Sequence, residues 1–297
     1  MKNLFLLAIL ISISFISQLY GFRIVNGTEA KFGEFPFAVA LITIYGNGIP
    51  FCSGSLITSV NVLTTAHCFR KPHDLWGKVV LAGEIDPLRP SYERPPPSRQ
   101  LRRIISVTNH PKAFDGQGKT NREFDVGIIK VAEAFILSAN VATISIAKKT
   151  LPNRSSCVAI GFGRNVEGPD GYHKSDRKLR YGKFIINSSK CDFQKGAVYC
   201  IYSRKRMTLF GDSGGPLIDR YPWQKYQYGV DSGSVIRPKY KVSFYTNVAL
   251  HRRWIIEQLG YKSSGTRTSK FLLIKSVTCG FIFQIILKGP NFKLVLF

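Results

Sequence analysis

Three short motifs carry side chains that could together turn a serine hydroxyl into a nucleophile. Ser213 lies in a GDSGGPL turn, His67 lies in TAHC, and Asp125 lies in FDVGII. A serine must lose its proton as it attacks, so it needs a base with a pKa near neutrality. A buried carboxylate can hold the imidazole of that base in the correct tautomer. The order His67, Asp125, Ser213 therefore predicts acyl transfer through a covalent intermediate.

The same turn contains candidate donors for the charge that develops on a substrate carbonyl oxygen. The backbone N–H groups of Gly211 and Ser213 are predicted to form an oxyanion hole. The loss of one such donor typically slows the reaction about 100- to 1000-fold. Glycine at position 211 lets the backbone approach the substrate closely.

The elements that must position these residues are mostly short strands. Apolar runs such as 37–44 and 78–81, rich in β-branched and aromatic residues, are separated by Gly, Pro and Asn, as in a β-sandwich or β-barrel. Helical periodicity is convincing only near 250–259, where Trp254 and Ile255 follow Leu250 by about one turn. Gly260 can cap the C-terminus of that helix. The chain is thus predicted to be all-β with a C-terminal helix.

The N-terminus predicts secretion. One positive charge at Lys2 precedes an apolar run from Leu4 to Ile16 that is short for a membrane span. We interpret residues 1–21 as a signal peptide, so the mature protein is expected to be extracellular or stored in granules. In such a compartment cysteines pair. Three acceptor sequons for N-glycosylation begin at Asn26, Asn153 and Asn187.

These features resemble the trypsin and chymotrypsin family of serine peptidases. The resemblance rests on RIVNG from Arg23, CSGSLI from Cys52, the three motifs above and FYTNV from Phe244, and it extends from Arg23 to Gly260. It implies two packed six-stranded antiparallel β-barrels, with a boundary near residue 138, the active site in the cleft between them and a C-terminal helix. Residues 24–260 would form this peptidase domain.

The resemblance also implies activation by proteolysis. Cleavage after Arg23 by an activating protease would remove a short propeptide, residues 22–23, and free an ammonium group at Ile24. In the family this group pairs with the residue that corresponds to Asp212 and orders the oxyanion turn. A buried pair of this kind suits a switch, because an unpaired buried carboxylate is costly.

The family pattern assigns two disulfides, Cys52 with Cys68 and Cys191 with Cys200. Cys157 matches a position whose usual partner is replaced here by Asp219. Cys157 and Cys279 therefore remain, either paired with each other, paired between molecules or free.

The primary substrate pocket departs from the family pattern. Met207 stands at its base, where an acidic residue would select basic substrates, and Leu209 replaces a cysteine that usually bridges the pocket walls. The opposite wall is expected to run through Asp231, Ser232, Gly233 and Ser234, with Ser243 on the third side, and Ser232 is expected to hydrogen-bond Asp125. Three preferences stay open: basic residues if Asp231 reaches the pocket, apolar ones if Met207 dominates, and acidic ones if Arg206 enters. We favour the apolar preference.

The net charge of +24 is unusual. Two basic residues precede Ile24 and six follow Gly260, with no acids in either segment, which leaves +16 for residues 24–260. This charge fits either a sulfated polysaccharide or another polyanion as partner, or a solvated cationic surface. No interleaving of aromatic and basic residues marks a specific nucleic-acid module.

Residues 261–297 lie beyond the resemblance, and their role is open. The apolar run 271–287 contains Lys275, whose insertion in a membrane would cost about 2.5–3.5 kcal/mol, so an extension is favoured over a membrane anchor. The sequence predicts no metal or cofactor. We conclude that the chain is a secreted serine endopeptidase acting on protein or peptide substrates. The alternative is a weak or inactive homologue that binds polyanions.

Overall fold

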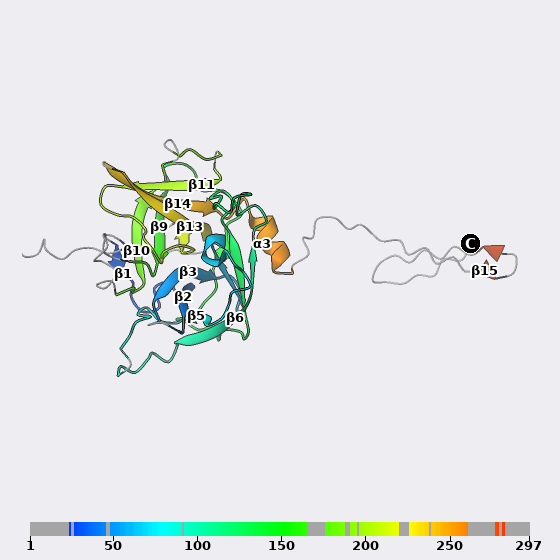
Figure 1. Cartoon of the computed structure of the whole chain (residues 1–297), viewed down its shortest axis with the longest axis horizontal. Helices are drawn as coiled ribbons and strands as arrows, with labels where there is room; N and C mark the ends of the chain where they lie inside the picture. The colour runs from blue at the N-terminus through cyan, green and yellow to red at the C-terminus, as the bar shows by residue number, and fades with distance from the viewer. Residues whose placement is uncertain are drawn as a thin grey trace, which may run out of the picture. The chain divides into compact units, whose positions relative to one another are not determined.

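The computed structural model describes residues 24, 27–45, 48–90, 92–164, 176–187, 191–194, 196–219, 226–237, 239–260, 277–278 and 281–282. The chain divides into two compact units, Met1–Gly260 and Tyr261–Phe297. The described part of the second unit consists of two paired strands, β15 (Val277–Thr278) and β16 (Phe281–Ile282). All remaining elements belong to the first unit (Figure 1).

The first half of this unit is a closed barrel of antiparallel strands in the order β2-β3-β4-β7-β6-β5. These strands are β2 (Ala38–Thr43), β3 (Pro50–Leu56), β4 (Asn61–Thr64), β5 (Lys78–Ala82), β6 (Gln100–Asn109) and β7 (Gly127–Val131). Closure satisfies the backbone groups of every strand edge. A single turn of 3-10 helix, η1 (Ala66–Phe69), follows β4.

The second half is a sheet in the order β1-β10-β9-β12-β13-β14-β11. Its strands are β1 (Thr28–Glu29), β9 (Ser156–Gly161), β10 (Arg180–Ile185), β11 (Val198–Ser203), β12 (Pro216–Ile218), β13 (Tyr226–Arg237) and β14 (Tyr240–Asn247). The short strand β8 (Ser145–Ile146) pairs with β13. A bridge between Ile186 and Ile201 joins the end of β10 to β11, so six of these strands curl into a second barrel.

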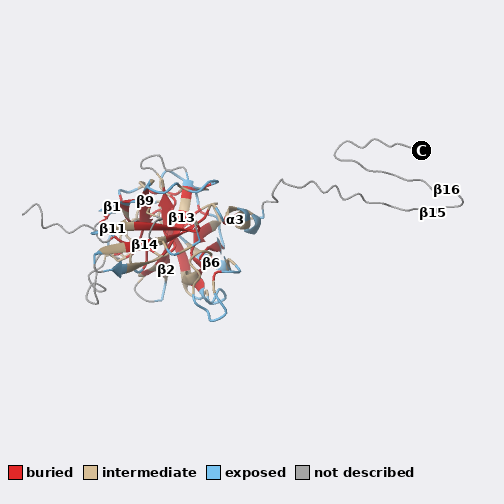
Figure 2. Cartoon of the chain, turned by 90° about the horizontal axis from the view of Figure 1, so that it is seen from above, coloured by how far each residue is buried: buried red, intermediate tan, exposed pale blue. Residues whose placement is uncertain are grey.

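Strand β2 shows how the alternating pattern builds two cores. Ala38, Ala40 and Ile42 pack in a cluster that includes Val158 and Ile160 of β9, so this cluster joins the two halves. Val39 and Leu41 point the opposite way, into the interior of the first barrel. Because both faces are covered, the strand is an uninterrupted apolar run, and Figure 2 shows the strands as the most buried part of the unit.

Within the first unit, the C-terminal helix α3 (Arg252–Gln258) packs against both halves through one face. Ile255 is buried with Leu63, Val126 and Val230, which come from both halves of the unit. Gly260 has a φ of +77°, which suits the residue just past a helix C-terminus. The all-β fold with two barrels and a C-terminal helix is thus confirmed. Within the described residues, no helix is long and apolar enough to cross a membrane.

Candidate active site

Strand pairing brings His67 and Asp125 together. Strand β4 ends at Thr64, which pairs with Gly127 at the start of β7, so the residues after β4 lie beside those before β7. The His67 Nδ1 atom is 2.7 Å from Asp125 Oδ2, and the backbone N–H of His67 donates to Asp125 Oδ1 at 2.9 Å. Asp125 therefore fixes both the backbone and the ring of His67.

A third donor reaches the same carboxylate from the second barrel. The Ser232 hydroxyl donates to Asp125 Oδ2 at 2.6 Å, and the Asp125 side chain is fully buried. With both oxygens hydrogen-bonded, a buried charge at this position is compensated. The contact between Ser232 and Asp125 is the one expected from the sequence.

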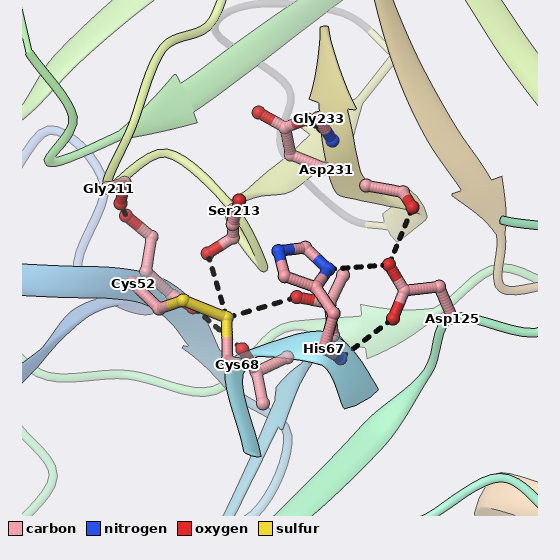
Figure 3. The surroundings of a disulfide bond; sticks show 12 residues. Cys52, His67, Cys68, Asp125, Gly211, Ser213, Asp231 and Gly233 are labelled. Carbon is pink, nitrogen blue, oxygen red and sulfur yellow. Dashed lines mark hydrogen bonds and ion pairs between the residues drawn. A yellow bond between two sulfur atoms is a disulfide. The ribbon is translucent and has the colours of Figure 1, made fainter. Parts of the chain in front are cut away.

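The turn that carries Ser213 is held from both barrels. Ser53 of β3 donates its N–H to the Ser213 carbonyl at 2.8 Å, and the Gly214 N–H donates to the Asp231 carbonyl at 2.8 Å. In Figure 3 the His67 ring lies between Asp125 and Ser213, with its second nitrogen on the Ser213 side. Among the described contacts the Ser213 hydroxyl is not hydrogen-bonded to the ring. Such contacts often tighten only when substrate binds.

The peptide between Phe210 and Gly211 is fixed by two donors. The Phe210 carbonyl accepts from the Arg164 N–H at 3.0 Å and from Arg177 Nη1 at 2.7 Å. Since a trans peptide places its N–H opposite its C=O, these bonds also set the direction of the Gly211 N–H. Neither Gly211 nor Ser213 donates its N–H to another group in the described part of the chain. Gly211 has a φ of +101°, a conformation that favours glycine.

Asp212 lies beneath this turn and is buried. Its oxygens accept from the Gly163 N–H and the Leu209 N–H, both at 2.8 Å. Burial raises the pKa of Asp212 to about 6, although these two bonds and the nearby cations Arg177 and Arg180 act in the opposite direction. Asp212 would therefore gain from an additional cation.

Hydroxyl groups connect the segments that are expected to form the primary pocket. Ser234 donates to the Thr208 carbonyl at 2.7 Å, and Ser243 accepts from the Thr208 N–H at 3.0 Å. Met207 is only 2% exposed. The segment at the pocket base is thus tied to both of the walls expected from the sequence. A register shift in β13 between Asp231 and Ser234 turns the Ser234 side chain toward this segment.

Asp231 is fully buried. Its Oδ1 accepts from the Gly233 N–H at 2.8 Å, whereas its Oδ2 has no hydrogen-bond partner among the described atoms. Burial and the negative charge of Asp212 raise the pKa of Asp231 well above its ordinary value. This shift disfavours the charged form that would attract a basic side chain. Arg206 is exposed and donates to the Lys183 carbonyl at 3.1 Å.

Four of the described cysteines form disulfides and one is free. The structure contains the disulfides Cys52–Cys68 and Cys191–Cys200. Cys157 is a buried free thiol, and burial raises its pKa to about 12, which makes it unreactive. Cys279 and Arg23 lie outside the described residues, while the Ile24 side chain is 2% exposed and packs beside Cys157.

Metal binding finds no support in the described residues. The one cluster there with metal-ligand spacing consists of Cys52, His67 and Cys68. Both of its sulfur atoms are in the disulfide shown in Figure 3, so they are not thiolate ligands.

No sequence pattern assigns Arg177, Ser53 or Thr208 a role at the site. Arg177 has a φ of +54° and is 1% exposed in a segment without strand or helix periodicity, so no pattern marks it. Ser53 lies within the CSGSLI segment, but its contact with the turn spans most of the sequence. Only the three-dimensional structure reveals these supports.

Comparison with known proteins agrees with this geometry. The sequence model of the family described as Trypsin matches residues 24–255. Trypsin theta of Drosophila melanogaster is 27% identical over 251 residues, covering 79% of this chain and 85% of the relative. Hypodermin-A of Hypoderma lineatum is 25% identical over 216 residues, covering 70% of this chain and 77% of the relative.

Solved structures share the fold. Human heparin binding protein has a TM-score of 0.63 at 23% identity and is covered over 98% of its length by 81% of this chain. Neuropsin, a serine protease from mouse brain, has a TM-score of 0.64 at 20% identity, with 98% of its length and 78% of this chain covered. With the family match over most of its length, the chain belongs to the trypsin family of serine peptidases.

Proposed function

We propose that this protein is a serine endopeptidase that hydrolyses peptide bonds through an acyl-enzyme. The observation that carries the proposal is the buried Asp125 carboxylate holding His67 beside the Ser213 turn. A purely structural role does not require a half-buried imidazole fixed at both its backbone and its ring. This arrangement fits a base that must change its charge during each turnover.

In the proposed mechanism, the Ser213 hydroxyl attacks the substrate carbonyl while His67 takes its proton. Asp125 stabilises the imidazolium, and the N–H groups of Gly211 and Ser213 stabilise the oxyanion. His67 then gives the proton to the leaving amine, and a water molecule hydrolyses the ester by the same route. No cofactor is required.

Activation is proposed to follow cleavage after Arg23. The new ammonium group of Ile24 would pair with Asp212, and the raised pKa of Asp212 indicates that this carboxylate gains from such a partner. The Gly211 turn would be ordered as a result. We also propose that the protein is secreted or stored in granules, with the N-terminal segment as signal peptide and with glycans on its acceptor sequons.

The proposed preference is for apolar residues before the scissile bond. In this proposal the buried Met207 lines the pocket base, and Ser234, whose hydroxyl donates to the Thr208 carbonyl at 2.7 Å, narrows the pocket. The raised pKa of Asp231 argues against a basic preference, because it disfavours the charged carboxylate that a basic side chain would pair with.

A second candidate function is binding of polyanions without efficient catalysis. The net charge of +24 and the narrowed pocket favour it, and one structural neighbour is described as a heparin binding protein. The intact geometry around Asp125 argues for the enzyme.

Peptidase activity on a library of peptides tests the first proposal. The chain, cleaved after Arg23, should release products, and Ser213→Ala should abolish the release. Asp125→Asn should lower kcat about 10⁴-fold while leaving the fold unchanged. Equal rates in the wild type and Ser213→Ala would contradict it.

A further inference from the structure

A groove lies at the turn end of the β13–β14 hairpin, next to the end of β11. Its volume is about 510 Å³, and it is lined by Arg204, Ile236, Arg237, Lys239, Tyr240 and Lys241. Arg204 follows β11, four of the other residues belong to the ends of the hairpin strands, and Lys239 lies in the connection between those strands. The groove lies outside the triad and the primary pocket described above.

The lining has four cationic side chains and no carboxylate. Arg204, Arg237 and Lys239 are exposed, and no ion pair of theirs occurs within the described part of the chain. Their charge is therefore turned to solvent.

Several basic residues elsewhere in the unit have acidic partners. Glu84 pairs with Arg89 and Arg99, each at 3.2 Å. Arg180 pairs with Asp176 at 2.6 Å. The groove differs from these sites because no carboxylate lies among the residues that line it.

Strand register holds these cations close together. In β13 and β14, Arg237 is opposite Tyr240 and Ile236 is opposite Lys241, while Ser203 of β11 is opposite Lys241 on the other side. These pairings bring together the strand ends that carry Arg204, Arg237 and Lys241, so their positive charges gather at one end of the sheet. Partial burial also lowers the pKa of Lys241. A bound anion would offset this concentration of positive charge.

We propose that this groove binds a sulfated polysaccharide. Sulfate groups keep their charge across the physiological pH range, and the arginines can hold such oxyanions by paired N–H donors. Ile236 and Tyr240 offer apolar surface to the sugar rings between the sulfates. An extended, regularly charged chain fits an open groove, which gives a small ligand little enclosure.

The test measures binding of a fluorescent heparin octasaccharide to the purified chain over a series of salt concentrations. The variant Arg204→Ser/Arg237→Ser/Lys239→Ser should bind about tenfold or more weakly, the expected size for three lost surface charge pairs. Its affinity should also depend less steeply on salt, because fewer counterions are released.

The matched control removes the same charge elsewhere, through Lys71→Ser/Lys148→Ser/Lys149→Ser, at three exposed positions. It should bind as the wild type does. Equal loss in both variants would show that only net charge matters, and no loss in the groove variant would show that the site lies elsewhere. Either result overturns the proposal, as does equal affinity for polyglutamate, which would indicate an acidic peptide.

The proposal does not depend on catalysis. The groove variant should react with a serine-directed probe as the wild type does, because none of its three residues contacts the triad. If the wild type fails to react but still binds the octasaccharide through the groove, the peptidase function fails and the polysaccharide site stands.

Discussion

The Asp125 carboxylate is fully buried and accepts three hydrogen bonds. Two donors belong to His67, its backbone N–H and its ring Nδ1, and the third is the Ser232 hydroxyl. Ser232 contributes from the second barrel, so the orientation of His67 depends on both halves of the fold. A preorganised polar site of this kind does not have to reorganise when charge develops on the imidazole.

Arg177 should affect the rate more than substrate binding. Arg177→Met removes one of the two donors that hold the Phe210 carbonyl and thereby frees the Gly211 N–H to turn away. We expect kcat to fall about 10- to 100-fold, less than the loss of an oxyanion donor itself, with KM nearly unchanged. Steady-state kinetics on one peptide substrate measure this.

The conservative variant Arg177→Lys should recover part of the lost rate, because an ammonium group can still donate to the carbonyl. Equal losses in both variants, or a rise in KM with kcat unchanged, would argue against a positioning role for Arg177.

The register shift in β13 has a consequence for specificity. Ser234→Gly removes the hydroxyl that reaches across to the Thr208 carbonyl and should widen the pocket. Cleavage after large apolar residues should then rise about tenfold in kcat/KM, whereas cleavage after alanine should change little. The ratio of the two rates in a substrate panel is the measurement. A uniform change for all residues would contradict a role of Ser234 in narrowing the pocket.

The junction between β6 and α3 is predicted to be sensitive to acid. His110 lies 5.0 Å from His251, ring centre to ring centre, and its Nδ1 accepts from the Lys112 N–H at 3.2 Å. Burial, with the charges of His251 and Lys112, lowers the pKa of His110 to about 4. The unfolded chain therefore binds more protons, so stability is full above pH 6.5 and is lost as the pH falls toward 4.

Urea unfolding at pH 7.5 and pH 4.5 tests this. When the pH falls from 7.5 to 4.5, the free energy of unfolding should decrease for both proteins. The decrease should be about 1 kcal/mol larger for the wild type than for His110→Phe, a figure that allows for the partial exposure of His110. The prediction fails if the two proteins lose the same amount.

Local patterns were enough to predict several of these elements. The apolar run at 37–44 predicted a strand, and β2 lies there. The spacing of Trp254 and Ile255 predicted a helix, and α3 contains both residues. The backbone conformations around the expected pocket were not predictable from the sequence, because they depend on the strand register and the φ angle of single residues. The shift between Asp231 and Ser234 and the positive φ of Arg177 arise from tertiary contacts that leave no periodic signal.

The charge of the whole chain adds a property that the fold does not require. A net +24 raises the rate of encounter with anionic partners and makes that encounter sensitive to salt. None of the residues that line the cationic groove belongs to the triad or to the expected substrate pocket.

The central claim is that Ser213 is an activated nucleophile once Ile24 becomes the N-terminus. The direct measurement is labelling by a fluorophosphonate probe after cleavage behind Arg23, with the cut verified by N-terminal sequencing and the labelled residue identified by peptide mapping. We expect the label on Ser213, none in Ser213→Ala, and little in the uncut Arg23→Gln. Absence of label from the cut wild type, or equal labelling of Ser213→Ala, would contradict the account.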